Sequence, residues 1–139
     1  MFATVVVGAD DSPTAAQAVD VAMQLVGLSG GSLHVVSAYK PVAGSSAGVP
    51  SEFDGAVPPD GRVRSVLDDL SARARARGVT VETHDHRGDP ARAVQDVADR
   101  VSADLIVTGS KGMNRRILSS VPDTIAHRAS CAVLIVKTD

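Results

Sequence analysis

The sequence predicts a doubly wound α/β domain with a five-stranded parallel sheet and helices on both faces, and three observations lead to this fold class. Short aliphatic runs alternate with helical segments along the chain, which is typical of strands joined by right-handed crossovers. The length of 139 residues suits one domain, and no linker or internal repeat divides residues 1–139. Phe2, Tyr39 and Phe53 are the only aromatic residues, so the core must consist of aliphatic side chains, as in strands covered on both faces.

Five runs predict the strands. Four of them are short and mostly apolar, which is typical of strands buried inside a parallel sheet. The third run contains more polar residues and is therefore expected at an edge of the sheet. In chain order, the predicted strands span residues 2–8, 32–39, 79–87, 104–108 and 132–136.

Four segments between these runs predict helices, because apolar residues recur in them at helical spacing. The predicted buried faces, one per helix, comprise Val19, Ala22, Met23 and Val26; Val63, Val66, Leu67 and Leu70; Val94, Val97, Ala98 and Val101; and Val121, Ile125 and Ala129. Three of the helices begin with an N-cap residue followed by an early proline, at Ser12–Pro13, Asp89–Pro90 and Ser120–Pro122. The remaining helix is expected over residues 62–77 and ends before Gly78.

Residues 41–61 interrupt this alternation with a segment that is rich in Pro, Gly, Ser and Ala. The segment has no sustained period, and a long insert of this kind in a compact domain is usually mobile or functional. Because it follows the second strand, we expect it on the ligand side of the sheet. Its central part, Ser45–Pro59, has little apolar content to pack and is predicted to be mobile.

Composition excludes several classes of function. The net charge is −2, so there is no positive excess to draw the chain onto nucleic acid. Cys131 is the only cysteine, which excludes an internal disulfide and points to a reducing compartment. The N-terminal segment has no basic leader, and no apolar stretch reaches membrane-spanning length. We therefore expect a cytoplasmic protein.

Two loops that follow strands form the candidate site, because ligands of doubly wound sheets bind beyond the carboxyl ends of strands, where the winding direction reverses. Residues 8–13 follow the first strand, and residues 108–116 follow the fourth. In the second loop, Gly109 and Gly112 would let backbone N–H groups approach an oxyanion, and the helix that opens near Ser120 adds unpaired N–H groups. These features fit a phosphate-binding loop, and the glycines alone fit a tight turn equally well.

The chain resembles the universal stress protein family over nearly its whole length. The resemblance rests on Gly109–Gly112 (GSKG) and Ser119–Pro122 (SSVP), and on the segments VVVGADDSPTAAQAV, LHVVSAY and CAVLIVK. It implies strand order 3-2-1-4-5, with the reversal between the first and fourth strands. It also implies an adenine nucleotide as ligand (ATP, ADP, AMP or cyclic AMP, with or without Mg²⁺) and a role in stress response or signalling. No dedicated turnover is expected, beyond slow ATP hydrolysis or autophosphorylation.

By this resemblance, the nucleotide-binding residues are Ala9, Asp10, Val35, Thr108, Gly109, Gly112, Arg115, Arg116, Ser119, Ser120 and Val121. Asp10 would accept a hydrogen bond from the adenine edge or a ribose hydroxyl, and Ala9 and Val35 would form walls of the adenine pocket. Asp10 also suits a plain turn, and Ser120 suits a plain helix cap.

The phosphate loop departs from the family pattern, which has glycine, two residues, glycine, nine residues, glycine and then Ser or Thr. Gly109 and Gly112 match the first pair, and Ser120 matches the last position. Ser119 replaces the third glycine, and only six residues separate it from Gly112. We expect the shortened loop to hold distal phosphates weakly, with Arg115 and Arg116 as substitutes.

Other interpretations concern a nucleotide-free role, a receiver fold, a metal site and the reactivity of the cysteine. A nucleotide-free dimeric interaction module of the same fold is the main alternative, and a phosphoacceptor receiver domain is disfavoured because His84–His86 stand where its phosphorylated aspartate should be. His84 and His86 share one face of the third strand, but the sequence places no third metal ligand beside them, so no metal site is predicted. Cys131 is expected to be an inert thiol.

The last strand, residues 132–136, is wholly apolar and is expected at a sheet edge. An apolar edge that is left open favours pairing with another chain. The family resemblance implies antiparallel pairing of two such strands across a two-fold axis. We therefore expect a homodimer with Val133, Leu134 and Ile135 near the axis.

Overall fold

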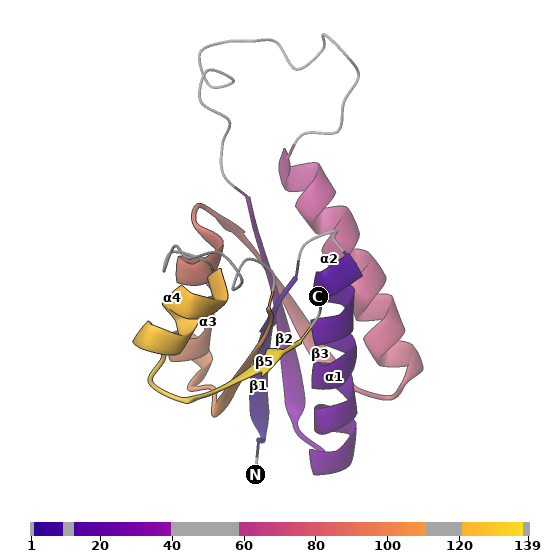
Figure 1. The fold of residues 1–139 in the computed structure, drawn as a ribbon. Coiled ribbons are helices and arrows are strands. Elements are labelled where there is room, and N and C mark those ends of the chain that lie inside the picture. Colours follow the sequence, from indigo (N-terminus) through magenta and orange to yellow (C-terminus); the bar gives the residue numbers. More distant parts are fainter. Residues whose placement is uncertain (1, 10–12, 40–58, 111–120, 138–139) are drawn as a thin grey trace, which may run out of the picture.

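The computed structural model describes residues 2–9, 13–39, 59–110 and 121–137. Within these ranges the chain alternates strictly between strands and helices, as predicted (Figure 1). The elements, in order, are β1 (Thr4–Gly8), α1 (Pro13–Ser29), β2 (Ser32–Tyr39), α2 (Pro59–Ala76), β3 (Thr80–Arg87), α3 (Pro90–Val101), β4 (Leu105–Gly109), α4 (Val121–Arg128) and β5 (Ala132–Val136).

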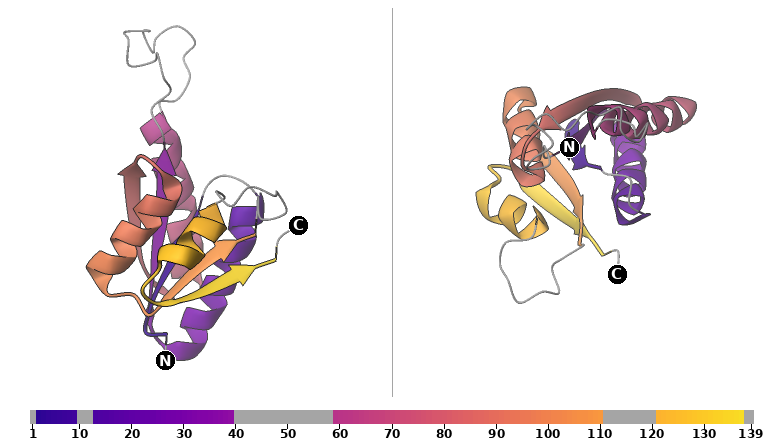
Figure 2. Two further views of the ribbon diagram at one scale, coloured as in Figure 1. Left: turned by 60° about the vertical axis from the view of Figure 1, so that its left-hand side comes forward. Right: turned by 90° about the horizontal axis from the view of Figure 1, so that it is seen from above.

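The strands form one parallel sheet with the order β3-β2-β1-β4-β5, which confirms the predicted topology. Helices α1 and α2 cover one face, and α3 and α4 cover the other (Figure 2). The chain winds outward from β1 through β2 to β3, then crosses to β4 and β5 on the other side. The direction of winding therefore reverses between β1 and β4.

Alternate residues of each strand supply two hydrophobic clusters, one on each face of the sheet. Val5 and Val7 of β1 pack under α1 and α2 with Val19 and Leu67, whereas Val6 packs under α3 and α4. The predicted buried helix faces are largely confirmed, because the following residues are buried: Val19, Ala22, Met23, Val26, Leu67, Leu70, Val94, Val97, Ala98 and Ile125. Aliphatic side chains thus fill both layers, as the shortage of aromatic residues predicted.

Local start and stop signals explain the boundaries of the elements. The carboxylate of Asp89 accepts a hydrogen bond from the backbone N–H of Arg92 at 3.1 Å and caps α3, as such residues usually do. Gly78 has φ +75° between α2 and β3, a conformation that glycine adopts without steric cost. One boundary was predicted wrongly: α2 begins at Pro59, so residues 59–61 belong to the helix and not to the insert. Proline at the first helical position accounts for this earlier start, and the rest of the predicted insert, residues 41–58, lies outside the described residues.

The amino end of the sheet is tied together by hydrogen bonds. The Asp104 carboxylate accepts from the backbone N–H groups of Ala3 at 2.9 Å and Thr4 at 3.2 Å, and the N–H of Asp104 donates to the Thr4 carbonyl at 3.0 Å. The N–H of Ser32 donates to the Ala3 carbonyl at 2.8 Å. These bonds fix the entry of β1 between its two neighbours. No helix in the described part of the chain is long and apolar enough to cross a membrane.

Candidate functional site

The strands β1 and β4 separate at their carboxyl ends, where the winding reverses. Their ladder joins Val5 to Leu105 and ends at Val7 and Val107. Each strand continues beyond this point on its outer side, since Gly8 still pairs with Val36 of β2 and Gly109 with Val136 of β5. This opening at the carboxyl end of the sheet is the position where doubly wound folds bind ligands.

Five of the predicted site residues lie in the described part of the chain, and four of them lie at this opening. Ala9 follows β1, is 8% exposed, and donates its backbone N–H to the Val36 carbonyl at 2.8 Å. Thr108 and Gly109 end β4, and Val121 begins α4 on the α3–α4 side of the sheet. Because a crossover helix runs antiparallel to its strands, the first turn of α4 lies at the carboxyl end of the sheet, and its backbone N–H groups point there.

Val35 is the predicted site residue that lies deepest. It has no exposed surface and belongs to the cluster under α1 and α2. A ligand at the strand ends would meet Ala9 first, and contact with Val35 would require movement of the side chains that cover it. The predicted phosphate loop and its acidic partner lie outside the described residues, namely Asp10, Gly112, Arg115, Arg116, Ser119 and Ser120.

A second cluster of polar side chains, His34, Glu82 and His84, lies at the β2–β3 edge of the sheet. Nδ1 of His34 lies 3.0 Å from Nε2 of His84 and 3.7 Å from Oε2 of Glu82. The two imidazole rings are 5.2 Å apart with an interplanar angle of 34°. Burial lowers the pKa of His84, and the neighbouring His34 lowers it further, so His84 is predominantly neutral at pH 7.

The histidine pair in the structure differs from the pair that the strand spacing suggested, His84 and His86. His84 contacts His34, whereas Nε2 of His86 lies 3.1 Å from Nη2 of Arg100 on α3. His34 is buried. The signal that the sequence analysis missed is the parallel register of β2 and β3, which places Glu82 directly beside His34.

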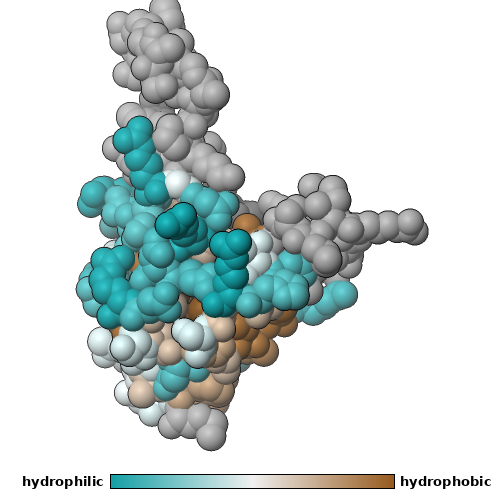
Figure 3. Space-filling view, turned by 90° about the vertical axis from the view of Figure 1, so that its left-hand side faces the viewer, coloured by the Kyte–Doolittle hydropathy of each residue, from teal (hydrophilic) through white to brown (hydrophobic). Residues whose placement is uncertain are grey.

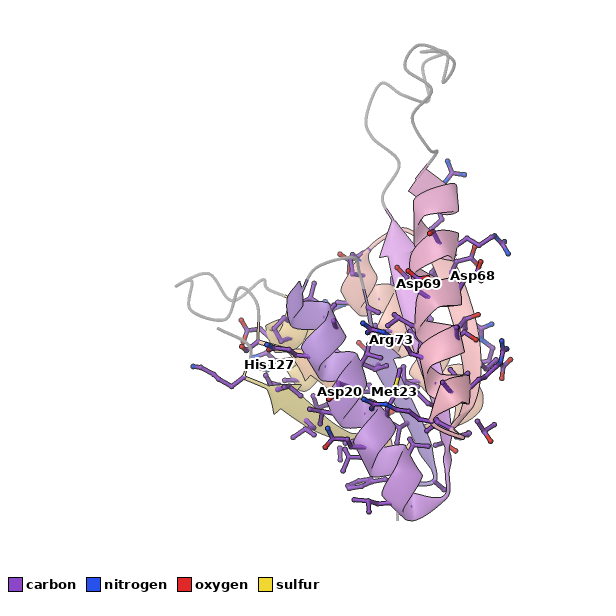
Figure 4. The ribbon with its side chains drawn as sticks, turned by 90° about the vertical axis from the view of Figure 1, so that its right-hand side faces the viewer. Asp20, Met23, Asp68, Asp69, Arg73 and His127 are labelled. Carbon is purple, nitrogen blue, oxygen red and sulfur yellow. The ribbon has the colours of Figure 1, made fainter. Side chains whose placement is uncertain are left out.

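A groove of about 780 Å³ lies between α1 and α2, on the opposite face from the histidines. Asp20 and Met23 of α1 and Arg73 of α2 line it, as Figure 4 shows. Arg77 and Asp20 form an ion pair of 2.7 Å at its margin, with both side chains about half exposed. A pair with this exposure contributes little to stability.

Cys131 precedes β5 at the amino end of the sheet and is partly buried. Burial raises the pKa of its thiol, and the carboxylates of Asp104 and Asp99 raise it further. A thiol with a raised pKa is a poor nucleophile at neutral pH. This environment agrees with the inert thiol that the sequence predicted.

Comparisons with known proteins point to one family. Residues 1–137 match the family model described as the universal stress protein family. A universal stress protein of Mycobacterium tuberculosis is 35% identical over 143 aligned positions, which cover 99% of this chain and 97% of the relative.

Solved structures give the same result. A crystal structure of a universal stress protein in complex with cAMP is 34% identical, has a TM-score of 0.79, and is covered over 97% of its length by 98% of this chain. The universal stress protein of Archaeoglobus fulgidus in complex with dAMP is 21% identical with a TM-score of 0.73, and the match covers 99% of this chain and 98% of that one. At that identity, the second likeness supports the fold alone.

Proposed function

Because this chain belongs to the universal stress protein family, we propose that it binds an adenine nucleotide at the carboxyl ends of β1 and β4. The observation that carries the proposal is the opening between these two strands, where the ladder stops at Val7 and Val107. A relative that is 34% identical over nearly the whole chain forms a complex with cAMP. Adenosine monophosphates, cyclic or linear, are therefore the first ligands to test.

The proposed roles of the residues follow the family resemblance, and Ala9 and Gly109 lie at the opening between β1 and β4. Ala9 would contact the adenine, and Asp10 would accept a hydrogen bond from the base edge or the ribose. The backbone of Gly109 and Gly112, Ser120, and the first turn of α4, which begins at Val121, would face the phosphate. The remaining proposed contacts are Val35, Thr108, Arg115, Arg116 and Ser119.

Calorimetry with AMP, cyclic AMP, ADP and ATP, under matched salt with and without Mg²⁺, tests the proposal, and GMP is the control for base recognition. We expect adenine nucleotides to bind and GMP to bind at least tenfold more weakly. Equal binding of GMP and AMP would contradict adenine recognition. Because the loop after Gly112 is short, ATP should bind no more than about tenfold tighter than AMP, or about 1.4 kcal/mol. A hundredfold preference for ATP would show that the loop wraps the triphosphate.

We further propose that two copies associate through β5. This edge strand is apolar, and Leu134 is 38% exposed on it, which favours pairing with another chain. Figure 3 shows hydrophilic residues over much of the α3–α4 side and a hydrophobic area at its lower right. Light scattering should give twice the mass of the chain, and Leu134→Lys should lower it, whereas Leu28→Lys, on the 87% exposed Leu28 of α1, should not. A mass of one chain at micromolar concentration would contradict the dimer.

A nucleotide-free interaction module is the second candidate function, and the shortened phosphate loop favours it. In that case none of the adenine nucleotides would bind at millimolar concentration, while the dimer would persist. Under either candidate, we propose a cytoplasmic protein in stress response or signalling that has no dedicated turnover.

A further inference from the structure

We propose that His34, Glu82 and His84 form a binding site for one Zn²⁺ ion that bridges the neighbouring strands β2 and β3. This site is separate from the proposed nucleotide site, because β3 lies at the far edge of the sheet and pairs with β2. Each residue offers one donor atom, and all three donor atoms lie within 4.8 Å of one another. The inference holds whether or not the chain binds a nucleotide.

The distances between the donor atoms fit a tetrahedral ion. Ligands at the usual zinc distances of about 2.0–2.1 Å are about 3.3 Å apart when they occupy corners of a tetrahedron. Nδ1 of His34 lies 3.0 Å from Nε2 of His84 and 3.7 Å from Oε2 of Glu82. These two distances lie on either side of the ideal edge, and the third distance, between the donor atoms of Glu82 and His84, is at most 4.8 Å.

The sheet holds two of the donors in place before any ion arrives. His34 and Glu82 are directly paired in the parallel register of β2 and β3, and His84 follows two residues later on the same face of β3. The side chain of His34 is 9% exposed, whereas that of Glu82 is 69% exposed. The cluster therefore has a fixed, buried end at His34 and an open end at Glu82 through which an ion would enter.

The kinds of donor also fit zinc. Two imidazoles and one carboxylate form a known zinc ligand set, in which the fourth position is left for water or another ligand. The imidazole donors suit zinc better than Mg²⁺ or Ca²⁺, which prefer oxygen ligands. In the 3.0 Å hydrogen bond between the rings, one of the two facing nitrogens carries a proton. Zinc binding requires both nitrogens to be unprotonated, so that proton would move to the other nitrogen of its ring. Arg100 lies beside the neighbouring His86, and the carboxylate of Glu82 would supply negative charge to the ion.

The matched control for this site is His86. It lies on the same strand and the same face as His84, and both side chains are partly buried. His86 contacts Arg100 instead of the cluster. His84→Ala and His86→Ala each remove one histidine from β3, so non-specific binding to histidine falls equally in both. Glu82→Gln is the third variant, because Glu82 is exposed and its substitution does not disturb the core.

The experiment is calorimetric titration of the untagged protein with Zn²⁺ at pH 7.5, followed by Co²⁺ substitution, in which a tetrahedral site gives intense visible absorption. We expect one Zn²⁺ per chain in the unmodified protein and in His86→Ala. We expect at least tenfold weaker binding in His84→Ala and Glu82→Gln, since even the loss of a supporting partner weakens a metal site by that much. Zinc should also raise the melting temperature of the unmodified protein, because it binds the folded state.

Three results would overturn the proposal. The first is absence of zinc binding at millimolar concentration, and the second is equal affinity in the unmodified protein, His84→Ala and Glu82→Gln. The third is a loss of zinc affinity in His86→Ala as large as the loss in His84→Ala, which would show adventitious binding to surface histidines. Circular dichroism of each variant establishes that the fold is intact, and Glu82→Gln keeps the test valid if a histidine variant unfolds.

Discussion

The two ends of the sheet differ in how β1 is held between its neighbours. At the amino end, the carboxylate of Asp104 accepts from two backbone N–H groups, and the N–H of Ser32 donates to Ala3. At the carboxyl end, the ladder between β1 and β4 stops at Val7 and Val107. Within the described residues, β1 is tied to both neighbours at the amino end and to β2 alone at the carboxyl end, so we expect the amino end to contribute more to stability and the carboxyl end to binding.

This division predicts two separable classes of variant. Changes at the amino end should lower the free energy of unfolding and leave nucleotide affinity unchanged. Changes at the carboxyl end should lower nucleotide affinity and leave the free energy of unfolding nearly unchanged, because binding residues are commonly carried on loops that tolerate substitution. The predictions below test this separation, from the largest expected effect to the smallest.

Gly31→Ala should cause the largest loss of stability, about 2–3 kcal/mol, because a Cβ at this position would lie 2.4 Å from the carbonyl oxygen of Ala3. That neighbour is backbone in the tied end of the sheet, so it cannot move aside cheaply. Gly27→Ala is the matched control, because a Cβ there would meet nothing within 4 Å, and the change should stabilise α1 by about 0.5–1 kcal/mol. Urea denaturation measures both, and equal effects would contradict the tight contact.

Asp10→Ala should weaken adenine nucleotide binding roughly ten- to a hundredfold, because a hydrogen bond to a charged group contributes about 1.5–3 kcal/mol. The free energy of unfolding should hardly change. Asp11→Ala makes the same change of charge one residue away and should bind nearly normally. Calorimetry compares the two, and an unchanged affinity in Asp10→Ala would reduce Asp10 to a turn residue.

Asp104→Ala should lower the free energy of unfolding by about 1–2 kcal/mol, because the N–H groups of Ala3 and Thr4 lose their acceptor. The loss is limited because water can accept hydrogen bonds from these exposed N–H groups instead. Nucleotide affinity should stay the same. Asp96→Ala, which removes an exposed carboxylate from α3, is the control for charge. If Asp104→Ala changed affinity more than stability, the two ends of the sheet would not be separable.

The smallest expected effect is on the rate at which the Cys131 thiol is alkylated. Burial, Asp104 and Asp99 raise the pKa of its thiol, so less thiolate is present at pH 8 than in the unfolded chain. Alkylation by iodoacetamide should be slower in the native protein than in urea, and Asp104→Ala should make the native reaction faster. Equal rates in the native and unfolded chains would show that the thiol is not protected.

The alternation of strands and helices and the buried helix faces were predictable because they depend on local patterns, whereas the strand order was expected from the family resemblance. Aliphatic runs, helical spacing and proline-containing starts such as Asp89–Pro90 are visible in the sequence. The His34–His84 contact was not predicted, because it depends on the register between two strands about fifty residues apart in the chain. The early start of α2 at Pro59 was missed because the preceding composition suggests an insert. For the nucleotide site, the sequence predicted the opening between β1 and β4 through the order of the strands.

Amide chemical-shift mapping with cyclic AMP is the sharpest test of nucleotide binding at the carboxyl ends of β1 and β4, because it reports on both ends of the sheet in one experiment. The account predicts the largest changes at the amides of Gly8, Ala9, Thr108 and Gly109, and almost none at Gly31 or in the segment Ala3–Thr4. Changes concentrated at the amino end, or in the groove around Asp20 and Arg73, would contradict it.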